Sequence, residues 1–187
     1  MGSAIDARFV RSEERIQDAL AALLKKKGLA QIGVSELARE ANVSRATFYA
    51  HYDNVHEAYE QLVGRAMERV QSFDEHFACS QCSGKAQNLP YCERIRTEGE
   101  LEGVLKDPSF FSVMMEQMTE SGSSSLENRL RERGVARDVA GALMLFQMSG
   151  CHAVALSPFA ERTDWHRIRT AIDRFIEGGL AAVGNGL

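Results

Sequence analysis

The stretch that most constrains the fold runs from Val34 to Tyr52 and reads VSELAREANVSRATFYAHY. Apolar residues recur in its first half at steps of three and four, which predicts a helix with one apolar face, ending near Ala41. Asn42 tolerates the left-handed backbone conformation that ends a helix. Ser44 follows where an N-cap belongs, because its hydroxyl can accept from the free backbone N–H groups of the next turn. Two short helices joined by a tight turn are therefore predicted.

The second of these helices is too short to bury itself, and it carries long polar side chains at its N-terminal end. Arg45 is the best candidate for reading bases, because a guanidinium can bind O6 and N7 of guanine together. Thr47 and Tyr49 bring hydroxyls suited to phosphates or base edges, and His51 and Tyr52 are expected along the DNA backbone. This pattern is typical of a helix-turn-helix whose second helix enters the major groove.

The motif resembles the N-terminal DNA-binding domain of the TetR family of transcriptional repressors. The resemblance is carried by Leu37-Ala38, Val43-Ser44, the run Thr47-Phe48-Tyr49, and Tyr52 followed by the helix-starting Asn54. It covers about the first third of the chain. It implies an all-α fold, with a three-helix helix-turn-helix domain followed by a helical domain that binds a ligand and dimerises. It also implies DNA contacts at Thr47 and Tyr49, and a long helix from Asn54 that transmits ligand binding to the DNA-reading helices.

Two positions depart from the family pattern, both at contacts to phosphate. Gly33 stands where a Ser or Thr usually caps the second helix, and Val55 stands where a Lys usually binds phosphate. Ser35 and His56 are the residues that can compensate. The complete predicted DNA-binding set is Gly33, Ser35, Ser44, Arg45, Thr47, Tyr49, His51, Tyr52 and His56.

Composition agrees with a helical, globular regulator. The chain of 187 residues has 44% hydrophobic residues and only 3 prolines, which favours a helical fold with a real core. The net charge of −4 argues against a protein coated in nucleic acid. Residues 1–53 nevertheless hold 8 Lys and Arg against 7 Asp and Glu, whereas the rest of the chain holds 14 against 19. A local DNA-binding face in the N-terminal part is therefore compatible with the acidic total.

The expected division is a DNA-binding domain over residues 1–55 and an effector-binding and dimerisation domain over residues 56–187. The first begins with an arm over residues 1–11, followed by a helix capped by Ser12. In the second, helices are predicted over 109–118, 137–156 and 164–183, with a weaker one between 90 and 107.

One reading helix offers too few contacts for repressor affinity, so we expect a homodimer on a palindromic operator. The helices over 137–156 and 164–183 are the predicted interface, where Gly141 and Gly150 allow close approach. The resemblance also implies a small-molecule effector bound in an apolar cavity. The candidate lining residues are Phe110, Phe111, Met114, Met115, Met118, Phe146, Met148 and Trp165, although such a set also suits an ordinary core.

Three cysteines and a histidine form a further candidate site. His76, Cys79, Cys82 and Cys92 have spacings suited to a zinc ion. The pair Cys79 and Cys82 also suits a reversible disulfide, hence a redox or electrophile sensor. Incidental loop cysteines are the third interpretation, and the sequence leaves all three open.

No signal peptide is recognised at the start of the chain, and the uncharged stretch 139–160 is interrupted by polar residues, glycines and a proline, so no membrane span and a cytoplasmic location are expected. No catalytic constellation is found, so an enzyme is not expected. We therefore predict a TetR-like repressor released from operator DNA by a small molecule. The alternatives are the same fold responding to zinc or thiol oxidation through His76, Cys79, Cys82 and Cys92, or a helical ligand- or metal-binding protein that has lost DNA binding.

Overall fold

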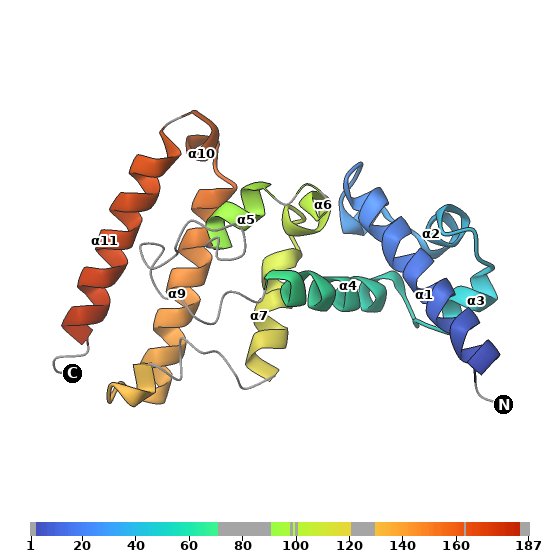
Figure 1. Cartoon of the computed structure of the whole chain (residues 1–187), viewed down its shortest axis with the longest axis horizontal. Coiled ribbons are helices and arrows are strands. Elements are labelled where there is room, and N and C mark those ends of the chain that lie inside the picture. The colour runs from blue at the N-terminus through green and yellow to red at the C-terminus, as the bar shows by residue number, and fades with distance from the viewer. Residues whose placement is uncertain are drawn as a thin grey trace. The chain divides into compact units, whose positions relative to one another are not determined.

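The structure is a computed structural model that describes residues 3–70, 91–97, 99, 101–120, 130–162 and 164–183. Within these ranges the regular structure is helical, without a β-strand (Figure 1), which confirms the predicted all-α fold. The chain divides into two compact units, one made of residues 1–68 and 99–114, the other of residues 69–98 and 115–187. The predicted domain boundary after residue 55 stays a prediction.

The first unit contains α1 (Ser3–Leu24), a short 3-10 helix η1 (Leu29–Gln31), α2 (Val34–Glu40), α3 (Arg45–Tyr49), most of α4 (Val55–Val70), α6 (Glu102–Leu105) and the start of α7 (Phe110–Glu120). The second contains α5 (Tyr91–Thr97), the rest of α7, α9 (Arg137–Ala155), α10 (Pro158–Arg162) and α11 (Trp165–Val183). The predicted helices over 109–118, 137–156 and 164–183 correspond to α7, α9 and α11. The single helix predicted between 90 and 107 is instead two helices, α5 and α6, with Gly99 between them.

Helix α1 begins earlier than predicted. It starts at Ser3, so residues 3–11 of the predicted arm are helical and Ser12 lies inside the helix rather than at its N-cap. The Ser12 hydroxyl bonds back to the carbonyl oxygens of Phe9 (2.8 Å) and Arg8 (3.0 Å), a satisfied alternative to capping. The apolar face of α1 agrees with its predicted periodicity, since Ile16, Ala19, Leu20, Leu23 and Leu24 are all buried.

Helix α4 starts with the predicted capping residues. Asn54 Oδ1 accepts from the backbone N–H of Glu57 at 3.0 Å, and Glu57 Oε2 accepts from the backbone N–H of Asp53 at 2.6 Å. The helix then buries Ala58, Tyr59, Leu62, Val63 and Ala66 along one side. α4 therefore starts at a defined residue directly after the helix-turn-helix.

Within the first unit, helix α6 packs against the C-terminal end of α1. Gly103 lies so close to α1 that a Cβ there would stand 2.5 Å from Lys25 N and 2.6 Å from Leu24 C. Buried Asp107 accepts from the backbone N–H of Leu29 (2.9 Å) and of Ser109 (2.9 Å). The segment between α1 and α2 is thus held by both packing and hydrogen bonds.

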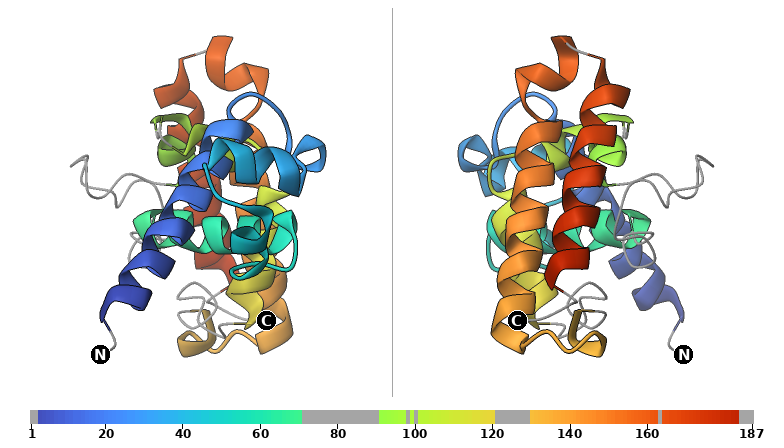
Figure 2. Two further views of the ribbon diagram at one scale, coloured as in Figure 1. Left: turned by 90° about the vertical axis from the view of Figure 1, so that its right-hand side faces the viewer. Right: turned by 90° about the vertical axis from the view of Figure 1, so that its left-hand side faces the viewer.

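In the second unit α9 and α11 lie side by side (Figure 2). At one end they share a cluster in which Leu130, Val135 and Ala140 are buried, with Leu180 and Val183 packed against it. In the parts of the chain that the structure describes, no helix combines the length and the apolar character that crossing a bilayer requires.

Candidate DNA-binding surface

The turn before α3 has the geometry that its residues predict. Asn42 has a φ of 51°, in the left-handed region, and Ala41 is the C-cap of α2. Ser44 is the N-cap of α3, and its Oγ accepts from the backbone N–H of Thr47 at 2.9 Å. The two hydroxyls of Ser44 and Thr47 are also hydrogen bonded to each other at 2.8 Å. The predicted turn and N-cap are therefore confirmed, and both hydroxyls are held at the N-terminal end of α3.

One face of α3 is anchored in the core and the opposite face is open. Phe48 is fully buried, with its ring edge-on to that of Tyr49 at a centroid distance of 5.6 Å. Ser44, Arg45 and Tyr49 are exposed, Tyr49 by 49% although it is a large aromatic residue. Helix α3 thus packs one aromatic side chain in the core and exposes a guanidinium and a phenol. This arrangement is typical of a helix that enters the major groove of DNA.

Tyr52 points into the unit instead of toward a partner. Its side chain is 4% exposed, and its hydroxyl accepts from Gln17 Nε2 at 2.8 Å and donates to Gln61 Oε1. Gln17 is itself buried and also donates to the carbonyl oxygen of Ala58 at 2.9 Å. Burial raises the pKa of Tyr52. Tyr52 therefore joins the end of the helix-turn-helix to α1 and α4, which removes its hydroxyl from the exposed contact surface.

Sequence reasoning did not single out Gln17. The available signal was a long amide directly beside Ile16 and three residues before Leu20, which are both apolar and buried. A polar residue at a core position must find partners for its donors and acceptors. Its partners lie 35 to 44 residues further along the chain, so no local pattern names them.

His51 lies against the N-terminal half of α1. Its ring centroid is 3.9 Å from that of Phe9, and its Nε2 is 2.7 Å from Ser12 Oγ. Nearby, Arg15 donates from Nη2 to the carbonyl oxygen of Asn42. The turn before α3 and the residue after its C-cap are therefore each in contact with α1, whose N-terminal half lies beside α3 in Figure 1.

A comparison with protein families matches the same segment of the chain. The family described as bacterial regulatory proteins, tetR family, matches residues 16–55, from the core of α1 to the start of α4. Over these residues the chain is similar to the DNA-binding domain of that family. An uncharacterised HTH-type transcriptional regulator of Bacillus subtilis (strain 168), YxbF, is 39% identical over 67 residues. That alignment covers 35% of this chain and 18% of the relative, so the similarity concerns a minor part of both proteins.

Few side chains suited to binding phosphate lie at the starts of α2 and α4. Gly33 caps α2 without a side-chain hydrogen bond, and the space around its Cα is open. Ser35 is exposed, while His56 at the start of α4 is exposed and lies 3.4 Å from Glu60 Oε1. Val55 adds no charge. The two helix ends therefore offer backbone N–H groups and a hydroxyl, with a carboxylate beside the one imidazole.

The residues predicted to line an effector pocket are divided between the two units. Phe110, Phe111 and Met114 belong to the first, whereas Met115, Met118, Phe146, Met148 and Trp165 belong to the second. Phe110 and Met114 are buried, but Phe146 is 68% exposed on α9. Trp165 is half-buried, and the guanidinium of Arg96 lies 4.3 Å from its ring centroid. The effector pocket stays a prediction, and Phe146 faces outward from its unit.

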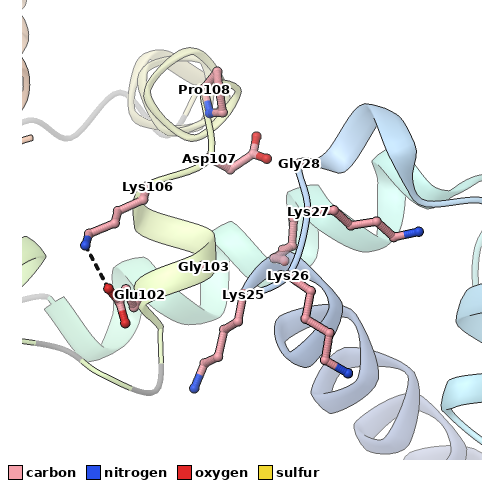
Figure 3. Close-up of a pocket in the computed structure, with 10 residues that line it drawn as sticks. Lys25, Lys26, Lys27, Gly28, Glu102, Gly103, Lys106, Asp107 and Pro108 are labelled. Carbon is pink, nitrogen blue, oxygen red and sulfur yellow. Dashed lines mark hydrogen bonds and ion pairs between the residues drawn. The ribbon is translucent and has the colours of Figure 1, made fainter.

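A cavity of about 400 Å³ lies in the first unit, where the C-terminal end of α1 meets α6. Its lining residues are Leu24, Lys25, Lys26, Lys27, Gly28, Glu102, Gly103, Lys106, Asp107 and Pro108. Figure 3 shows the side chains of Lys25, Lys26 and Lys27 pointing in different directions. Lys106 is bound by Glu102 at 2.7 Å, which lowers the pKa of that carboxyl. The lysines thus do not converge on one point, as a site for a single anion would require.

The candidate zinc or thiol site cannot be assembled from the described residues. His76, Cys79 and Cys82 lie outside them, and Cys92 is buried on α5. Burial, followed by the nearby Cys92 and Asp173, raises the pKa of Cys151 to about 12, so this thiol is protonated at neutral pH and a poor nucleophile. Among the described residues no group of three or more His, Cys, Asp or Glu side chains is placed to hold a metal ion. Zinc binding stays a prediction.

Acid is expected to destabilise the second unit through His152. Its Nδ1 is 2.7 Å from the Tyr91 hydroxyl, and burial lowers the pKa of His152 while it raises that of Tyr91. The folded state therefore binds fewer protons than the unfolded state below a pH of about 6.5, the ordinary imidazole pKa. This contribution to stability is complete above that pH and is lost as the pH falls through the lowered pKa.

Thermal unfolding followed by circular dichroism at several pH values between 8 and 5 checks this expectation. His152→Asn keeps an acceptor near the position of Nδ1 but cannot titrate. The melting temperature of the variant should fall less on acidification than that of the unaltered protein. Equal falls in both would contradict the assignment.

Proposed function

We propose that this protein is a transcriptional repressor that binds palindromic operator DNA as a homodimer and is released by a small-molecule effector. The observation that carries the proposal is the open face of α3. Arg45 and Tyr49 are presented to the outside by a helix whose start is fixed by Ser44 and whose other side is fixed by Phe48. Such a helix can read base edges with Arg45 while the hydroxyls around it bind phosphate.

The dimer is supported by the exposed surfaces of α9 and α11. On α9 an uncharged exposed stripe recurs at steps of three and four residues and contains Ala142, Leu145, Phe146, Gly150, Ala153 and Leu156. On α11 Phe175 is 71% exposed, and Ala171, Gly178, Gly179 and Ala182 are exposed with it. A Cβ at Gly150, Gly178 or Gly179 would meet no atom within 4 Å. Large exposed aromatics beside small residues suit a four-helix contact with a second copy.

Release would follow from a shift between two arrangements of the dimer. An effector that binds better to the arrangement in which the two α3 helices no longer match successive major grooves lowers operator affinity. The candidate residues within the second unit are Met115, Met118, Met148 and Trp165. The proposal commits to a small molecule in the C-terminal part and to no particular compound.

Selection of duplexes from a randomised library by the full-length protein tests the function. We expect enrichment of a two-fold symmetric sequence with half-sites about 10 base pairs apart, or a multiple of that distance. Failure to enrich any sequence, by a protein that is folded and dimeric, would favour the alternative of a helical ligand-binding protein without DNA binding.

Arg45→Ala is expected to relax base preference at one position of each half-site. Removing a bidentate interaction with guanine should cost roughly 1–3 kcal/mol on the selected duplex and much less on a mismatched one. Competition binding against single-base variants of the selected duplex measures this. Arg131→Ala removes the same charge from an exposed position in the second unit and serves as the matched control. An unchanged base preference in Arg45→Ala would exclude Arg45 as a base-reading residue.

A further inference from the structure

The N-terminal turns of α1 contact the helix-turn-helix through residues that lie outside the buried core. Phe9 is 47% exposed, yet its ring lies 3.9 Å from that of His51, which directly follows α3 and its C-cap. Ser12 Oγ is 2.7 Å from His51 Nε2, and Arg15 donates to the carbonyl oxygen of Asn42 in the turn before α3. Three residues of α1, spaced by three, therefore contact the segments that flank the reading helix on its two sides.

Arginines accompany these contacts along the same side of α1. Arg8 and Arg15 are four residues before and three residues after Ser12, so they share its face, and Arg11 flanks that face. All three arginines are exposed. Arg15 uses Nη2 to hold the carbonyl of Asn42, two residues before the N-cap Ser44. Arg8 and Arg11 thus continue a basic edge that starts beside the N-terminal end of α3.

We propose that the N-terminal turns of α1 form a second DNA-contacting element, in which Arg8 and Arg11 bind backbone phosphates beside the base pairs that α3 contacts. This inference rests on the proposed function and extends its contact surface to a segment outside the helix-turn-helix. The arginines add affinity and fix the orientation of α3, whereas base preference stays with Arg45.

Charge complementarity identifies DNA as the partner. A guanidinium binds phosphate through two parallel N–H bonds and is the side chain best matched to that geometry. The edge meets the helix-turn-helix at Arg15, which donates to the carbonyl oxygen of Asn42 in the turn before α3. The acidic residue nearest to Ser12, Glu13, is turned away, because its Oε1 accepts from Gln61 Nε2 at 2.9 Å on the side of α4.

The same element accounts for the missing phosphate contacts elsewhere in the domain. Gly33 and Val55 carry no phosphate-binding group, and His56 lies near a carboxylate. Two arginines at the start of α1 restore the cationic contacts that these positions lack. The anchoring of Phe9 and Ser12 on His51 matters here, because a held arginine loses less conformational freedom on binding than one on a free tail.

The test is the affinity of full-length protein for the selected duplex as a function of salt, measured by fluorescence anisotropy. Arg8→Gln combined with Arg11→Gln should weaken binding roughly tenfold at moderate salt. The slope of log affinity against log salt should become less negative by about 0.9 for each phosphate that is no longer bound, hence by about 1.8 for each protomer on the duplex. Repeating the library selection with this variant should return the same consensus sequence.

Two further variants separate a charge effect from a structural one. Arg8→Lys with Arg11→Lys keeps both charges and should recover most of the salt dependence. Glu14→Gln neutralises an exposed acid on the same helix and should strengthen binding or leave it unchanged. Arg15 is left intact, because its replacement would also release the carbonyl of Asn42.

An unchanged affinity and salt slope in the double glutamine variant, with the consensus still selected, would overturn this inference and leave the proposed function standing. A changed consensus would assign base reading to α1 and also overturn it. A protein that enriches no duplex at all would overturn the proposed function and the inference together.

Discussion

Replacing Phe146 and Phe175 with glutamate is expected to turn the proposed dimer into a monomer. Both residues are about 70% exposed, at 68% and 71%, and exposed small residues accompany them on α9 and α11. Burying a phenylalanine contributes about 1.5–3 kcal/mol, and the glutamates would in addition place unpaired carboxylates in the interface. Since each change occurs twice in a two-fold dimer, we expect a loss of roughly 4 kcal/mol or more, about a thousandfold in the dissociation constant.

Sedimentation velocity is the direct measurement. The unaltered protein should sediment as a species of twice the chain mass of 20.7 kDa, and the double variant as the single chain. Val10→Glu is the matched control, because it puts the same charge at an exposed apolar position in the other unit. A glutamate variant that remains dimeric would place the interface elsewhere, and an unaltered protein that is monomeric would contradict the dimer altogether.

The double glutamate variant should also bind operator DNA more weakly. A single reading helix contacts only one half-site, so a monomer should lose most of its affinity for a two-fold symmetric duplex. The residual binding should resemble that of any duplex, dominated by phosphate contacts and strongly dependent on salt. A monomer that keeps full operator affinity would show that the two half-sites are not read together.

The parts of the structure that were predicted from the sequence are those determined by neighbours in the chain. Asn42 and Ser44 act within one turn of themselves, so the left-handed residue and the N-cap could be assigned from their side chains alone. The helix boundaries of α9 and α11 follow from an apolar period of three and four residues. Local signals place the start of α1 at Ser12, whereas the helix begins at Ser3 and its first turns contact His51, which is distant in the sequence.

Side chains whose roles depend on distant partners could not be placed in the same way. Tyr52 has the appearance of a DNA contact by its position after the reading helix, but its hydroxyl is bound by Gln17 and Gln61. Asp107 would be taken for an exposed acid, yet it is buried and holds the backbone of Leu29, 78 residues earlier. The sequence shows which residues can form hydrogen bonds, but it does not show which of them are partners.

Gly103 is a third residue whose role depends on a distant partner. Gly103→Ala is expected to disrupt the packing of α6 against α1. From the sequence this glycine is a residue that weakens a helix. In the structure a Cβ at this position would lie 2.5 Å from Lys25 N, 2.6 Å from Leu24 C and 2.8 Å from Leu24 O. These are backbone atoms at the end of α1, so no side chain can rotate away and one helix must move.

We expect Gly103→Ala to destabilise the protein by about 3 kcal/mol, at the upper end of the usual cost of overpacking, despite the better helix propensity of alanine. Thermal unfolding followed by circular dichroism measures the loss of stability. Gly99→Ala is the matched control, because a Cβ there would meet no atom within 4 Å, so it should leave stability nearly unchanged. Equal stability of the two variants would mean that α6 does not press on α1 in solution.

The contact between α6 and α1 also bears on DNA binding, because the displaced end of α1 leads directly into the segment that Asp107 holds before α2. A shift of α1 at Leu24 and Lys25 would be transmitted along a helix whose other end contacts His51 beside α3. Gly103→Ala should therefore lower operator affinity even at temperatures where the protein remains folded, whereas Gly99→Ala should not. If operator affinity is retained while stability falls, the contact between α6 and α1 contributes to folding alone. The position of α3 would then depend on α4 rather than on this contact.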